Sequence, residues 1–434
     1  MTGRVGSMQI TSQLSAMAGL RYGLLGLPLA FVALPLYVIL PNHYATEFGV
    51  PLATLGAVLL GARLLDAGID PLIGRWCDRL FARSLGSVLA FGACAALLLA
   101  AGFGLLFFPP TRAPTPLVAW ATVLLIATYA AYSALSVAHQ SWGAMLGGDE
   151  AQRSRIVAWR EGLGLVGVVL ASVSPLLLGL GATVGLFWAA LLLGWLAWTR
   201  SLRPRVATTA LPSNVWLPLR RAAFRRLLGV FVLNGIASAI PATLVLFFSQ
   251  DRLQAPRFME AAFLATYFVC AAASLPLWLR VVAHHGLARS WLWGMLLAVA
   301  SFAGATQLGA GDTLGFLAVC ALSGVALGTD LALPGALLAG VIADAGDRGS
   351  REGAYFGWWN FATKLNLALA AGLALPLLGL FGYSPGARDA AALGALTFAY
   401  CLLPCGLKLC AGALLYLRII RPETNQTTPC KDAY

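Results

Sequence analysis

Apolar runs of about 20 residues or more recur along the whole 434-residue chain. A helix needs about 20 residues to cross a bilayer core, and only helices and closed barrels satisfy their backbone polar groups there. Hydrophobic residues make up 59% of the chain and charged residues 11%, about half the charge of a typical soluble domain. The sequence therefore predicts an all-α membrane protein whose helices span the bilayer.

We expect twelve spans, at about 21–40, 52–74, 85–108, 116–146, 156–180, 183–199, 224–249, 258–281, 290–309, 313–342, 353–381 and 390–417. The longest polar connection, 201–223, is rich in arginine and proline and divides the spans six and six. This division predicts an N-terminal six-helix bundle over 1–200, a C-terminal six-helix bundle over 224–421 and a cytoplasmic tail at 422–434. No apolar core followed by a cleavage site precedes the first span, so we expect no cleaved signal peptide.

The basic residues predict the orientation, because short cytoplasmic loops accumulate lysine and arginine. With the N-terminus inside, only Arg112, Arg252, Arg257 and Arg388 fall on outer segments. The net charge of +12 is then a topology signal and gives no reason to expect a nucleic-acid partner. We expect a monomer in the cell (inner) membrane, surrounded by membrane lipid, with both termini cytoplasmic.

Three ionisable residues interrupt the second expected span. Arg63, Asp66 and Asp70 fall on one helical face at about 100° per residue. Ionisable groups at membrane depth cost roughly 2.5–3.5 kcal/mol each on insertion scales, so they normally face a bundle interior and mark an ion or substrate route. We therefore place the candidate functional site around these three side chains.

A short repeat relates the two halves. Pro71-Leu-x-x-Arg75 follows the second span of the first half, and Pro276-Leu-x-x-Arg280 follows the second span of the other. Half-to-half repetition is typical of secondary transporters that rock two bundles about a midplane site. The chain also lacks a nucleotide-binding loop and a soluble domain that could hydrolyse ATP, which argues against a primary pump.

Several motifs resemble one known transporter family. The pattern Gly74-x3-Asp78-Arg79-x3-Arg83 resembles the loop motif of the major facilitator superfamily. Within it, segment 62–74 (ARLLDAGIDPLIG) is similar to the glycoside-pentoside-hexuronide:cation symporters, the group of the melibiose permease. Three further matches are WREG at 159–162, REGAYFG at 351–357 and a lysine at 364.

The resemblance implies a major facilitator fold of two pseudo-symmetric six-helix bundles that work by alternating access. It assigns Arg75, Asp78, Arg79 and Arg83 to a cytoplasmic gate held by charge pairs. A purely structural role, in which these residues cap helix ends, is the alternative.

The resemblance also assigns coupling-cation binding to Asp66 and Asp70, with Arg63 and Lys364 as coupling residues. Counting Asp330 as well, three carboxylates face two positive groups, so one cation would neutralise the core. Na⁺ suits oxygen ligands, and a carboxylate pair can also share a proton. We expect no other metal and no cofactor. Static ion pairs are the alternative, although buried pairs are poor stabilisers.

The substrate site is less constrained. Arg160 matches a family position that contacts substrate, but it could also extend to the headgroups. Asp330, just before Pro334, could bind substrate or pair with Lys364. Where the melibiose permease has sugar-binding groups, this chain has Ala30, Ser136 and Gln140, which disfavours a galactoside.

Polar and aromatic residues could rebuild a pocket, since they suit polar organic ligands. The candidates are His139, Gln140, Trp359 and Asn360. We expect a cation-coupled transporter of a small polar organic solute, such as a sugar or glycoside, and no enzyme. The alternatives are a lysolipid or amphipathic-molecule transporter, a membrane enzyme acting on lipid through the carboxylates and lysine, and a scaffold that does not transport.

Overall fold

The structure is a computed structural model, and it describes residues 14–207, 214–384 and 386–422. Within these ranges the regular structure is helical and contains no strand. Positions 1–13, part of the expected connecting loop (208–213) and all but the first residue of the expected tail (423–434) lie outside the described residues.

The first half of the chain forms one group of helices and the second half another. The first group is α1 (Ala16–Gly23), α2 (Gly26–Phe31), η1 (Pro35–Ile39), α3 (Leu40–Phe48), α4 (Leu52–Arg83), α5 (Leu85–Phe107), α6 (Pro114–Leu146) and α7 (Glu150–Thr199). The second group is α8 (Leu217–Arg220), α9 (Ala222–Phe247), η2 (Phe248–Arg252), α10 (Arg257–His285), α11 (Leu287–Ala305), α12 (Thr313–Asp344), α13 (Glu352–Leu380), α14 (Ala390–Thr397), η3 (Phe398–Leu402), α15 (Leu403–Leu415) and η4 (Tyr416–Ile420).

These elements make twelve membrane-crossing segments in the described part of the chain. Nine helical segments are long and apolar enough to cross a bilayer. One of them, α7, contains two crossings, because Gly179 has φ 79° and interrupts the helix. The remaining two are α4, with 32 residues, and α13, with 29. The predicted all-α membrane fold is confirmed, and its long helices agree with the twelve expected crossings.

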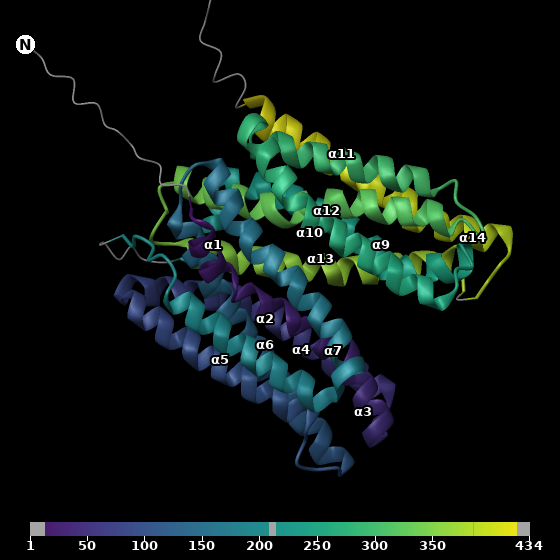
Figure 1. Cartoon of the computed structure of the whole chain (residues 1–434), viewed down its shortest axis with the longest axis horizontal. Helices are drawn as coiled ribbons and strands as arrows, with labels where there is room; N and C mark the ends of the chain where they lie inside the picture. Colours follow the sequence, from purple (N-terminus) through teal and green to yellow (C-terminus); the bar gives the residue numbers. More distant parts are fainter. Residues whose placement is uncertain (1–13, 208–213, 385, 423–434) are drawn as a thin grey trace, which may run out of the picture.

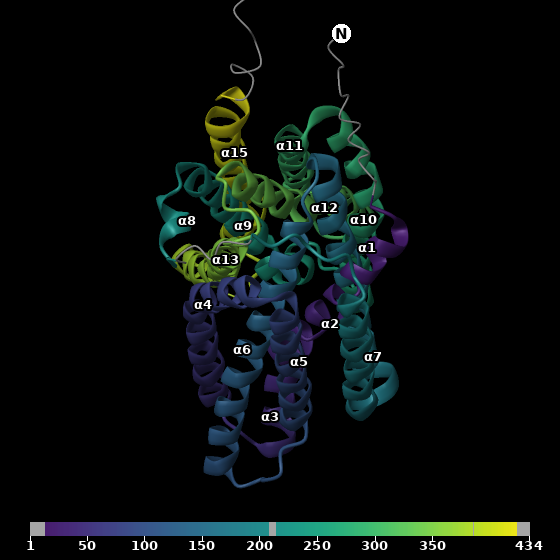
Figure 2. The same cartoon turned by 90° about the vertical axis from the view of Figure 1, so that its left-hand side faces the viewer.

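The two groups form two bundles that converge at one end and diverge at the other (Figure 1). The convergent end, called here the joined end, contains the start of α1, the last turn of α4 and the start of α13. Figure 2 views the molecule from this end and shows α4 lying beside α13. Across the boundary between the halves, α4 packs on α13 and α7 packs on α12.

Glycines allow α4 and α13 to touch backbone to backbone near the joined end. A Cβ atom at Gly74 would overlap the carbonyl oxygen of Gly353, and one at Gly357 would lie 2.6 Å from the carbonyl oxygen of Asp70. Contacts this close are possible only where a side chain is missing. The glycines therefore bring the α13 backbone against the part of α4 that contains the two aspartates.

Candidate transport cavity

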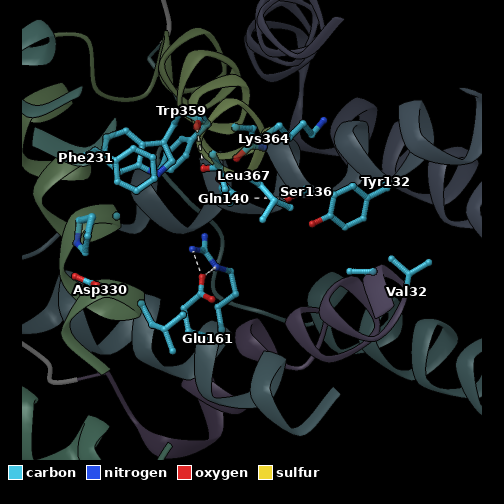
Figure 3. Close-up of a pocket in the computed structure, with 18 of the residues that line it drawn as sticks. Val32, Tyr132, Ser136, Gln140, Glu161, Phe231, Asp330, Trp359, Lys364 and Leu367 are labelled. Carbon is cyan, nitrogen blue, oxygen red and sulfur yellow. Dashed lines mark hydrogen bonds and ion pairs between the residues drawn. The ribbon is translucent and has the colours of Figure 1, made fainter. Parts of the chain in front are cut away.

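A cavity of about 410 Å³ lies between the two bundles. Its volume falls within the range of about 300–1,000 Å³ that is usual for small-molecule sites. The walls come from η1, α6 and α7 of the first half and from α9, α12 and α13 of the second. Figure 3 shows side chains of both halves facing this space. A ligand here would contact both bundles at once.

Lys364 links the two halves at the edge of this cavity. It extends from α13, and its ammonium lies 2.6 Å from Asp66 Oδ2 and 2.7 Å from Asp70 Oδ2, both on α4. It also donates a hydrogen bond of 2.8 Å to Ser133 Oγ, which in turn donates to Asp66 Oδ1 at 2.7 Å. The side chain of Lys364 is 20% exposed and lines the cavity, whereas those of Asp66 and Asp70 are 3% and 0% exposed. The lysine therefore lies between the carboxylates and the cavity.

The carboxylate pair is incompletely satisfied. Asp70 Oδ1 is buried and has no hydrogen-bond partner among the described residues. Arg63 forms no ion pair with either aspartate in the described residues; its guanidinium lies over the ring of Tyr37, 3.7 Å from the centroid. Two carboxylates thus share one ammonium, and the cluster of Asp66, Asp70 and Lys364 is net negative when both acids are ionised. A bound cation or proton would offset this excess.

Most of the residues predicted to bind substrate line the cavity. Gln140 lies on α6, Arg160 on α7, Asp330 on α12, and Trp359 and Asn360 on α13. Their side chains thus come from four helices that belong to both halves.

Two contacts order this wall. Arg160 forms an ion pair with its neighbour Glu161 at 2.5 Å, and their side chains are 15% and 28% exposed. Trp359 stacks on Phe231 with the ring centroids 3.8 Å apart. Arg160 therefore faces the cavity with its charge already balanced, and it does not extend to the membrane surface. The cavity offers a neutral ion pair, amides and one aromatic stack.

The structure differs from two of the predictions. His139 does not line the cavity: it is 0% exposed, its Nε2 lies 2.8 Å from the carbonyl oxygen of Tyr22, and its ring packs against Trp198. Asp330 does not pair with Lys364. Its partner is Lys408 on α15, whose ammonium lies 2.9 Å from Asp330 Oδ2. The core charge count made without Lys408 was therefore wrong.

Asp78 closes the joined end, in a different way from the predicted charge pairs. Its buried carboxylate accepts hydrogen bonds from the backbone N–H groups of Gly353 (2.6 Å) and Ala354 (3.0 Å) at the start of α13. A carboxylate at a helix N-terminus satisfies free N–H groups and interacts favourably with the helix dipole. The predicted gate arginines lie around it, with Arg75 half-buried and Arg79 and Arg83 exposed.

Two other contacts join the halves at this end. Glu150, at the start of α7, accepts a hydrogen bond of 2.8 Å from the N–H of Leu287 at the start of α11. Arg348 donates to the carbonyl oxygen of Leu146 at 3.4 Å. Sequence reasoning missed both residues, because no local pattern indicates which loop a lone charged residue will meet.

Three residues of the polar clusters were also missed. Lys408 lies in the middle of the last expected span, and the cost of such a charge was a usable signal. Glu161 was visible in the WREG motif but was not selected. Ser133 gives no signal, since a serine within an apolar helix is common. Among the described residues, no group of three or more histidine, cysteine, aspartate or glutamate side chains could hold a metal ion.

Two bundles around a central cavity, joined at one end by helix-terminal contacts, are the arrangement that alternating-access transporters use. Residues 16–420 match the model of a family described as MFS/sugar transport protein. The chain belongs to this family, and hence to the major facilitator superfamily. No curated protein gives a significant match to the chain.

Solved structures share the fold at low sequence identity. A bacterial homologue of the iron transporter ferroportin, in an outward-facing state, is 15% identical with a TM-score of 0.71, over 93% of this chain and 99% of that one. The fucose:proton symporter of E. coli is 14% identical with a TM-score of 0.68, over 93% and 98%. The human organic anion transporter MFSD10 is 19% identical with a TM-score of 0.61, over 92% and 98%.

Proposed function

We propose that this protein is a cation-coupled symporter, similar to the melibiose permease group, that moves a small polar organic solute by alternating access. The observation that carries the proposal is the position of Lys364. This residue of the second half forms ion pairs with both Asp66 and Asp70 of the first half. Whatever competes for these carboxylates also changes the connection between the bundles.

The coupling mechanism follows from this competition. A Na⁺ ion or a proton that binds Asp66 or Asp70 weakens their hold on Lys364, because the carboxylates no longer carry an excess negative charge. The ammonium then becomes available to the cavity, where it can interact with solute. Solute and cation together would thus favour the movement of one bundle against the other. Cation binding is coupled to solute binding only if both change the same equilibrium.

The cavity wall favours a polar solute. Gln140, Asn360 and the Arg160–Glu161 pair offer hydrogen-bond donors and acceptors, and Trp359 offers an aromatic face. Such a combination suits the hydroxyl groups and apolar faces of a sugar or glycoside. The family description, which names sugar transport, supports the same class. We propose that the protein works as a monomer without a cofactor.

The joined end is proposed to face the cytoplasm. It contains the described parts of the basic connecting segment, 201–207 and 214–223, and the gate arginines, and basic segments remain on the cytoplasmic side. In this orientation Asp78 closes the inner gate, and the divergent end opens outward. We place the protein, with this orientation, in the cell (inner) membrane as part of the same proposal.

The test begins with a ligand panel. A ligand that binds only the folded state raises its apparent stability, so thermal unfolding of the purified protein is measured with sugars, organic acids and lysolipids, with and without Na⁺. A solute identified in this way is then offered to proteoliposomes that carry a Na⁺ gradient or a pH gradient.

Asp66→Asn and Asp70→Asn should abolish concentrative uptake while the protein remains folded. Asp344→Asn is the matched control, because Asp344 is exposed at the end of α12. Undiminished accumulation by both aspartate variants would exclude the cation site. Saturable, Na⁺-stimulated binding of a lysolipid, with no response to any sugar or acid, would favour the lysolipid alternative.

A further inference from the structure

A second cavity, of about 200 Å³, lies inside the C-terminal half. It is bounded by α9, α10, α11, α12 and α15 and by η3. Five aromatic side chains line it: Phe263, Tyr267, Phe268, Phe302 and Tyr400. We call it the aromatic cavity. The mechanism proposed above makes no use of it.

The aromatic cavity is adjacent to the transport cavity. Asp330 lines both of them, whereas Lys408 and Ser238 line only the aromatic cavity. One side chain is therefore accessible from both spaces, and Figure 3 shows Asp330 at the edge of the transport cavity, on the side of Phe231. A solute that occupied both spaces would pass this carboxylate.

The carboxylate of Asp330, which lies between the two cavities, has hydrogen-bond partners on both of its oxygens. Asp330 accepts hydrogen bonds from Asn234 Nδ2 (2.9 Å), Trp291 Nε1 (2.8 Å) and Ser238 Oγ (3.1 Å), and it pairs with Lys408. Lys408 also donates to Asn234 Oδ1 at 2.8 Å. This network leaves neither charge unpaired, so the cavity presents no net charge to a ligand. A neutral, largely apolar group therefore fits it better than an ion.

The size of the aromatic cavity limits its occupant. An apolar cavity of about 150 Å³ binds benzene, so a volume of about 200 Å³ accommodates one aromatic ring or a short alkyl chain. The acyl chain of a lysolipid has at least about twice as many carbon atoms as benzene, so the whole chain does not fit into this volume. The transport cavity, at about 410 Å³, is large enough for the polar remainder of a solute.

We propose that the aromatic cavity is a substrate subsite that binds an aromatic ring or short alkyl group carried by the transported solute. The polar part of the same solute occupies the transport cavity, with the linkage beside Asp330. This inference rests on the proposed transport function and narrows its substrate class to polar solutes with one compact apolar substituent.

A photoreactive aromatic probe tests the subsite directly. The purified protein in lipid nanodiscs is illuminated with trifluoromethyl-diazirinyl benzyl alcohol, and the labelled residues are mapped by mass spectrometry. We expect saturable labelling of α10 and α12 near Tyr267 and Leu327, which line the aromatic cavity, and displacement by excess benzyl alcohol. Labelling spread over lipid-facing positions without displacement would overturn the proposal.

A pair of variants controls for partition into lipid. Ala242 lines the aromatic cavity and is also exposed, so it lies at the rim and Ala242→Phe fills the space without disturbing the core. Ala265 on α10 is exposed and does not line the cavity, so Ala265→Phe is the matched control. We expect saturable labelling to fall at least tenfold in Ala242→Phe and to persist in Ala265→Phe. Equal labelling of both variants would also overturn the subsite.

A second measurement separates this inference from the transport proposal. The solute found with the ligand panel is compared with its benzyl ether or ester. Burying a ring should strengthen binding about tenfold or more, and Ala242→Phe should remove the gain. Equal affinity of the two forms overturns the subsite and leaves transport intact. If the native protein shows no gradient-driven uptake of the solute but is still labelled saturably, the proposed transport function is refuted and the subsite is not.

Discussion

At the scale of single residues, the two lysines in the core have different partners and different consequences. Lys364 pairs across the two halves, whereas Lys408 pairs within the C-terminal half. Movement of the bundles against each other must therefore stretch or break the first pair, while the second can persist. Two charges of the same type at membrane depth thus have separable roles, which substitutions should reveal.

Lys364→Met should block coupled uptake and lower stability. The substitution leaves Asp66 and Asp70 buried without a cation, and removal of one partner from a buried ion pair costs about 3–5 kcal/mol. Na⁺ or acid should then stabilise the variant more than the native protein, because no ammonium competes for the carboxylates. Thermal unfolding at several pH values, with and without Na⁺, measures this effect. If the stability of the variant depended on pH and on Na⁺ in the same way as that of the native protein, a coupling role of Lys364 would be excluded.

The Asp330–Lys408 pair should behave as a coupled structural unit. Asp330→Asn leaves a buried ammonium unpaired, and Lys408→Met leaves a buried carboxylate, so each should lower the free energy of unfolding by about 3–5 kcal/mol. The double variant removes both charges and should recover most of this loss. Denaturant unfolding of the three proteins tests the pair. Additive losses would show that the two charges act independently.

At the scale of secondary-structure elements, the joined end depends on how two helices terminate. The last turns of α4 meet the first turn of α13, and Asp78 receives the N–H groups that the α13 helix leaves free. Gly74 and Gly353 allow this approach. Opening this end must therefore expose unsatisfied helix N–H groups together with a carboxylate, which gives the closed state its advantage.

Asp78→Asn should shift the protein away from this closed state. The amide oxygen can accept one of the two backbone hydrogen bonds, but the amide NH2 group cannot accept the other, and the amide lacks the charge that favours a helix N-terminus. Spin labels at Arg83 on α4 and Ala283 on α10, both exposed, report the separation of the halves. We expect a larger population at long distance. Arg79→Gln, at an exposed position of the same turn, should leave the distribution unchanged.

At the scale of the whole molecule, the basic segments and the closed gate lie at the same end. The convergence of the bundles there leaves their other ends apart (Figure 1). If basic segments remain in the cytoplasm, the molecule is closed inward and open outward. The orientation therefore decides which conformation of the transport cycle this is.

Labelling from outside intact cells tests the orientation. Arg112→Cys, in the exposed connection between α5 and α6 at the divergent end, should react with a membrane-impermeant maleimide. Arg83→Cys, exposed at the joined end, should react only after the cells are permeabilised. Exposed native cysteines, such as Cys94 and Cys410, are replaced first. The reverse pattern would invert the proposed topology.

Local patterns predicted much of this molecule. The lengths of the apolar runs predicted the twelve crossings, because bilayer thickness acts on each run independently of its neighbours. The cost of charge at membrane depth singled out Arg63, Asp66 and Asp70, and the family resemblance added Lys364. The structure brings Asp66, Asp70 and Lys364 together. Arg160 and Asn360 were placed on the cavity by motif and residue type, and both line it.

Pairing could not be predicted in the same way. For Asp330, substrate binding and a pairing with Lys364 were both open, but its partner is Lys408, because contacts between distant spans depend on how the helices rotate and pack. The same reason explains His139, which faces the bundle interior although one residue later Gln140 faces the cavity. A step of one residue turns a side chain by about 100°, so a small error in helix rotation reverses the outcome.

By itself, the sequence determined that this protein is a helical membrane protein and that Asp66 and Asp70 lie in its core, since hydrophobic length and charge cost are local properties. Only the tertiary structure decided which charges meet, that Asp78 binds a helix terminus rather than an arginine, and that an aromatic cavity adjoins the transport cavity. These features arise between helices far apart in the chain. Packing alone sets the distances between them.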